Sequence, residues 1–157
     1  MKTTQQLAKH FRDVHFGGNW TFVNLKDTMA DISWQEATAK HLDFNTIATL
    51  LFHINYYVNP VLKVLQGEPL IASDKYSFDC PAITSQEEWE NFAQKSMDEA
   101  ELFAQEIEKL DELKLFEFFS EEKYGNYFRN LLGIIEHTHY HLGQISLIKK
   151  LIRQKEY

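Results

Sequence analysis

The stretch Glu136-His137-Thr138-His139-Tyr140-His141-Leu142-Gly143-Gln144 places three histidines within five residues. Around it, apolar residues recur at seven-residue intervals in two neighbouring rows, which begin at Tyr127 and Leu131. This repeat predicts a long helix over 126–153 whose buried face contains the stretch.

Two of these three histidines are spaced to share one metal ion. His137 and His141 are four residues apart, so they project from one face of a helix, and their imidazoles can reach the same ion. His139 cannot join them, because residues two apart do not face each other on a helix.

The apolar rows are interrupted at one level, where Thr138 and His141 take core positions. A buried polar group without a partner costs about 1–3 kcal/mol. Two such groups at one level therefore indicate a shared ligand, and a metal ion is the simplest one.

The rest of the chain predicts three more long helices. Helical spacing of apolar residues covers 4–15, about 45–66 and 85–110. Capping residues Asn24 and Ser33 precede short helices over 25–32 and 34–40, and Asp43 or Asn45 is expected to cap the helix that runs to position 66.

The remaining segments are connections. Residues 68–84 have no helical period and predict an irregular surface segment, 113–119 predicts a strand-like segment or a helical turn, and 120–125 predicts a turn. Pro60 is expected to kink the second long helix. The expected fold is all-α, a single domain over 1–157 built as an antiparallel four-helix bundle with long, partly helical connections.

His53 is the expected third ligand, because it borders the apolar stripe of the second long helix. Three imidazoles leave one coordination position open, which is typical of a catalytic metal site. The alternative is a histidine-rich helix surface plus one hydrogen-bonded core histidine. His10 and His15, on the first helix, are expected at the surface.

Charge and composition narrow the partners. The formal charge is −7, and the one basic cluster, which complements a helix dipole, lies near the C-terminus at Lys149, Lys150, Arg153 and Lys155. Nucleic acid and anionic membranes are therefore not expected partners. A single cysteine, no apolar signal segment at 1–6 and no long apolar run predict a cytoplasmic protein without a membrane span.

Three segments resemble the DinB/YfiT superfamily of metal-dependent four-helix-bundle proteins. They are Phe52-His53-Ile54-Asn55-Tyr56-Tyr57, the pattern His137-x-x-x-His141-Leu142-Gly143-Gln144-Ile145, and Gly18-Asn19-Trp20. The resemblance implies a homodimer that binds a divalent ion through His53, His137 and His141. Zinc or nickel is the expected ion, with iron, manganese and copper as alternatives.

The resemblance also implies chemistry with a low-molecular-weight thiol, since relatives include thiol S-transferases and a maleylpyruvate isomerase. Members often carry arginine directly after the second helical histidine, whereas this chain has Leu142. That departure weakens the case for an anionic thiol cofactor.

The expected function is transfer of a metal-activated thiol to an electrophilic small molecule. Trp20, Asn55, Tyr56 and Gln144 are expected to line the substrate cavity, with Gln144 alternatively orienting a ligand imidazole. A metal-dependent hydrolase is the second enzymatic candidate, because no carboxylate stands at a suitable helical phase to act as a base. A non-catalytic metal-binding stress-response bundle is the third.

Overall fold

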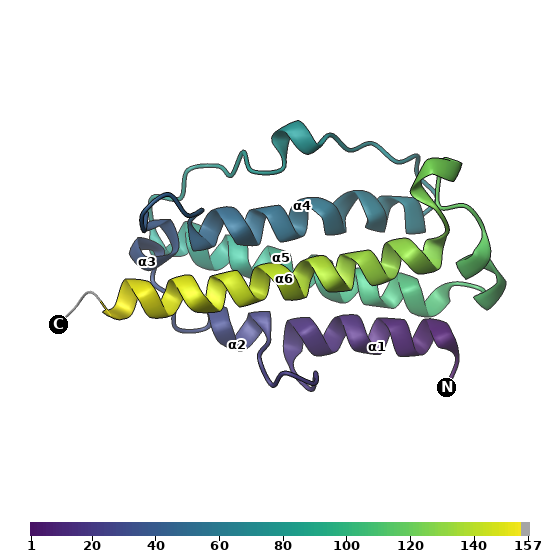
Figure 1. The fold of residues 1–157 in the computed structure, drawn as a ribbon, viewed down its shortest axis with the longest axis horizontal. Coiled ribbons are helices and arrows are strands. Elements are labelled where there is room, and N and C mark those ends of the chain that lie inside the picture. The colour runs from purple at the N-terminus through teal and green to yellow at the C-terminus, as the bar shows by residue number, and fades with distance from the viewer. Residues whose placement is uncertain (155–157) are drawn as a thin grey trace.

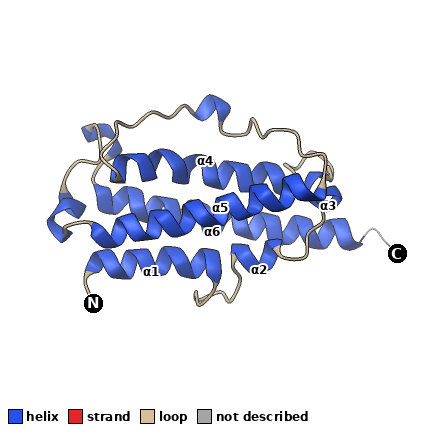
Figure 2. Ribbon diagram, turned by 180° about the vertical axis from the view of Figure 1, so that it is seen from behind, coloured by secondary structure: helices blue, strands red, loops and turns tan. Residues whose placement is uncertain are grey.

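The computed structural model describes residues 1–154, which contain helices and irregular connections and no strand (Figure 2). The all-α prediction is confirmed. Four helices are long, namely α1 (Thr3–Phe16), α4 (Ile47–Leu65), α5 (Gln86–Lys109) and α6 (Tyr127–Arg153). The shorter elements are α2 (Leu25–Met29), α3 (Trp34–Thr38) and the 3-10 helices η1 (Asp74–Tyr76), η2 (Glu112–Phe116) and η3 (Glu122–Tyr124).

The four long helices lie side by side around one apolar core (Figure 1). Each of them packs against two others: α1 and α4 both contact α5 and α6. The chain direction differs from a simple antiparallel arrangement, because α4 and α5 follow each other in sequence and yet run the same way (Figure 1). This is achieved by residues 68–84, here called the strap, which return along the outside of α4 before α5 begins.

The α-helices other than α1 begin where capping side chains satisfy free backbone N–H groups. Asn24 and Ser33 each accept a hydrogen bond from the backbone N–H three residues later, as the sequence predicts, and Asn126 does the same at the start of α6. The expectation for α4 was wrong, since Thr46, rather than Asp43 or Asn45, accepts from the N–H of Thr49.

The structure gives more detail than the sequence for two other segments. Helix α4 continues through Pro60 as far as Leu65. The segment over 113–119 is mainly the helical turn η2, and one isolated β-bridge joins Phe118 to Asn126.

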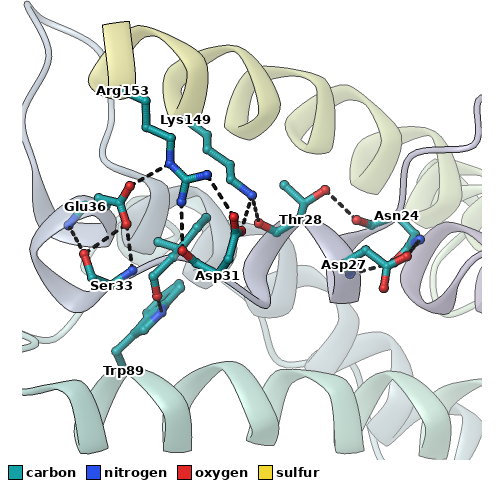
Figure 3. A network of polar contacts seen from close by, with 10 residues as sticks. Asn24, Asp27, Thr28, Asp31, Ser33, Glu36, Trp89, Lys149 and Arg153 are labelled. Atoms are coloured by element: carbon teal, nitrogen blue, oxygen red, sulfur yellow. Dashed lines mark hydrogen bonds and ion pairs between the residues drawn. The ribbon is translucent and has the colours of Figure 1, made fainter. Parts of the chain in front are cut away.

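Helix α1 is about half as long as α6, so α2 and α3 cover the second half of α6 (Figure 1). A polar network secures them there (Figure 3). The Lys149 ammonium donates to the carbonyl of Thr28 (2.8 Å), and the Arg153 guanidinium pairs with Asp31 and Glu36. Two cations of the C-terminal basic cluster are therefore engaged in ion pairs within the fold.

His15, expected at the surface, is buried. Its Nδ1 donates to the carbonyl oxygen of Phe11 (2.9 Å), and its ring packs against the Phe11 ring. The helix therefore satisfies one ring nitrogen locally, which makes a neutral histidine tolerable in the core.

Within residues 1–154, no helix combines the length and the apolar character needed to cross a membrane.

Candidate metal centre

The structure brings His53, His137 and His141 together between α4 and α6. One ring nitrogen from each lies within 4.8 Å of the others, and the ring centroids are 4.5–4.9 Å apart. Helices α4 and α6 are packed neighbours, so a histidine at mid-length of α4 meets the i, i+4 pair on α6. This is the one such cluster of potential ligands among the described residues.

Hydrogen bonds hold two of the rings in the form that a metal ion needs. His53 Nδ1 lies 3.0 Å from the carbonyl oxygen of Ser77, and His141 Nδ1 lies 2.7 Å from Oε1 of Gln144. Because both partners are acceptors, each Nδ1 carries the proton, and each Nε2 keeps a free lone pair. Acceptors of this kind behind ligand imidazoles are a regular feature of metal sites.

His137 gives independent support for a bound ion. Its Nδ1 is buried and has no hydrogen-bond partner among the described residues. A buried nitrogen without a hydrogen-bond partner costs free energy. Three neutral imidazoles that face one another are a set of ligands that suits zinc, nickel, copper or iron. The residues present therefore fit a divalent transition metal.

The three imidazoles are neutral at physiological pH. Burial lowers the pKa of all three, and it lowers that of His137 to about 4, with His141 and His53 contributing further. Neutral imidazole is the form that binds metal ions, so ligation needs no deprotonation at neutral pH.

Thr138 does not share in the site. Its hydroxyl is buried and donates to the carbonyl oxygen of Ile134 one turn earlier (2.8 Å). The expectation that one ligand explains both polar core residues is therefore wrong for Thr138, whose hydroxyl finds its partner within the helix. His139 faces α1, where it stacks on His10 with ring centroids 6.4 Å apart.

The strap forms the outer wall of the site. Phe78 stacks on His53 at 3.8 Å between ring centroids and 10° between planes. Tyr57 stands edge-on to both His53 and His137, and its hydroxyl donates to Oδ1 of Asp74 on the strap (2.9 Å). The sequence pattern did not identify Phe78 or Tyr57 as part of the site, although Tyr57 lies four positions after His53 and so shares its helix face.

Of the four expected cavity residues, the structure brings Gln144 to the histidines. Asn55 donates to Glu99 of α5 (2.6 Å), because a residue two positions after His53 points away from it. Tyr56 donates to the carbonyl oxygen of Ser73 on the strap (2.6 Å). Trp20 lies on the connection after α1 and is 93% exposed.

A cavity of about 530 Å³ adjoins the histidines. Its walls come from α4, the strap, η3 with the residues before it, and the first half of α6. His137 and Tyr57 line it, so the metal centre has access to a space of a size that holds small-molecule ligands.

Comparison with protein-family models, with characterised proteins and with solved structures finds no match to this chain.

Proposed function

We propose that this protein is a metal-dependent enzyme of the DinB/YfiT type, a homodimeric four-helix bundle that transfers a low-molecular-weight thiol to an electrophilic small molecule. The observation that carries the proposal is the convergence of three neutral imidazoles beside a cavity. Three protein ligands leave a coordination position free for a reactant.

When bound there, a divalent ion supplies positive charge that favours the deprotonated form of a nucleophile. The protein residues supply orientation and shielding. Ser77 and Gln144 fix the rings of His53 and His141 through their Nδ1 atoms. Phe78 covers His53 from outside the bundle, which keeps water from that face of the ring.

A metal-dependent hydrolase, with water as the nucleophile, is favoured by one observation that the sequence does not reveal. Asp74 of the strap lines the cavity and accepts from Tyr57, which itself contacts His137. This places a carboxylate near the site, which is what a hydrolase needs as a base. The carboxylate is already engaged by Tyr57, so thiol transfer remains the first candidate.

Metal binding is tested first, by elemental analysis of tag-free protein. Near-stoichiometric zinc or nickel is expected in the wild type, and little in His53→Ala and His141→Ala. His139→Ala is the matched control, because His139 lies on the same helix but faces α1. Equal metal content in all four proteins would refute the site.

Activity is tested with the cobalt-substituted protein. Added thiols are expected to change its visible spectrum, and thiol consumption is expected with a panel of alkylating and epoxide electrophiles. Ester hydrolysis without thiol would favour the hydrolase instead. Unfolding on treatment with a chelator, with no turnover in either assay, would favour a non-catalytic role for the metal.

A further inference from the structure

The cavity beside the metal centre is lined by α6 over more than two helical turns. It extends from His137 to Arg129, which are eight residues apart and therefore separated by about 12 Å along the helix. Gly133 lies between them and lines the cavity, and a Cβ added there would meet no atom within 4 Å. The absent side chain at Gly133 thus leaves the middle of the cavity open.

Arg129 is the one arginine or lysine among the residues that line the cavity. Its Nη1 donates to the carbonyl oxygen of Tyr124 (3.1 Å), which holds the side chain over the η3 turn. It forms no ion pair within residues 1–154. Its charge is therefore available to a ligand, and a guanidinium matches carboxylate and phosphate geometry.

Three carboxylates also line the cavity, and two of them already have partners. Asp74 accepts from the Tyr57 hydroxyl, and Glu121 pairs with Lys123 at 3.0 Å. Glu136 lies next to His137, at the opposite end of the cavity from Arg129. Its charge disfavours a second anionic group near the metal centre.

We infer that the cavity binds an elongated small molecule with a single anionic group, a carboxylate or a phosphate, which pairs with Arg129 while the reacting end lies at the three histidines. The inference rests on the proposed function for its reacting end only. The anionic subsite at Arg129 is formed by residues that do not touch the metal ligands.

The test uses two probes that share a metal-binding head. Suberic acid monohydroxamate carries a carboxylate at its far end, and octanohydroxamate ends in a methyl group. Their affinities for zinc-loaded protein are measured by calorimetry, together with zinc content. In Arg129→Gln, the affinity for suberic acid monohydroxamate divided by the affinity for octanohydroxamate is expected to fall about tenfold. This is the effect of losing one charge-assisted hydrogen bond to the carboxylate.

Gly133→Leu fills the middle of the cavity and is expected to weaken both probes at least tenfold. Gly143→Leu is the matched control, since Gly143 lies on the same helix, also has no atom within 4 Å of an added Cβ, and is not among the residues lining the cavity. An unchanged ratio in Arg129→Gln, or unchanged affinities in Gly133→Leu, would overturn the inference.

A metal-free arm separates this inference from the proposed function. If the protein binds no zinc, the proposed function fails, and octanoate is then titrated into the metal-free protein. Binding to the wild type that is lost in Arg129→Gln would still support the anionic subsite. Equal binding, or none, in both proteins would refute it.

Discussion

Replacing Gln144 by Met is expected to lower the affinity for zinc by about 10–100-fold, the usual loss when the partner of a metal-bound histidine is removed. Oε1 of Gln144 accepts from Nδ1 of His141, which is 7% exposed, and methionine has similar length but only a weak sulfur acceptor. A buried N–H without its acceptor costs about 1–3 kcal/mol, and about 1.4 kcal/mol corresponds to a tenfold change in affinity. The cost of the unpaired N–H therefore agrees with the expected loss of zinc affinity. The unpaired ring can also move its proton to Nε2, the nitrogen that has to be free for the ion.

The assay is competition for zinc against a chromophoric chelator, with thermal unfolding of the metal-free proteins to show that the fold is retained. Gln144→Glu is the control, because it keeps an acceptor oxygen at the same position and is expected to bind zinc at least as tightly as the wild type. Zinc affinity in Gln144→Met within twofold of the wild type would refute the role of this hydrogen bond. A loss in Gln144→Glu as large as that in Gln144→Met would do the same.

The remaining predictions concern His137, whose Nδ1 is buried, and the buried side chains of Trp89 and His15. His137→Leu is expected to abolish zinc binding without lowering the melting temperature of chelator-treated protein, because it removes the buried Nδ1 that has no partner; a clear drop in that temperature would contradict the reasoning. Trp89→Phe is expected to lower the free energy of unfolding by about 1–3 kcal/mol in urea titrations, since the Ile32 carbonyl loses the Nε1 donor at 2.8 Å, and equal stabilities would argue against it. Burial lowers the pKa of His15 from 6.5 to about 4, so the unfolded chain takes up this proton first as the pH falls. His15 alone is therefore expected to reduce the free energy of unfolding by up to about 3 kcal/mol between pH 6.5 and 4, at about 1.36 kcal/mol for each pH unit. His15→Asn, which keeps a nitrogen donor for the Phe11 carbonyl, should remove that part of the slope, and an unchanged slope would disprove it.

The helices were predictable because their determinants are local. Apolar residues repeat every few positions along a helix, and capping residues such as Asn24 and Ser33 bond to the first turn of their own helix. The cap of α4 was missed because several neighbouring polar residues can each accept from the first turn. Thr46 directly precedes Ile47, the first residue of α4, which is buried in the core by tertiary contacts.

Within the site, contacts between residues close in sequence could be predicted, and contacts between distant residues could not. The i, i+4 pair on α6 identifies two ligands, and Gln144 is three residues from His141, so these contacts can be seen in one helix. The contribution of Asp74, Ser77 and Phe78 could not be seen. It exists because the chain returns along α4 to start a parallel α5, and the strap has no periodic pattern that reveals this path.

The attachment of the strap has a consequence for the dynamics of the site. It is held to α4 by individual hydrogen bonds at Tyr56, Tyr57 and His53, which join residues only 17–24 positions apart. Such a segment can open as a local unit while the long helices stay folded. Each opening would free the imidazole of His53 from its carbonyl partner, so amide hydrogen exchange in the strap and the rate of metal release should report one shared fluctuation.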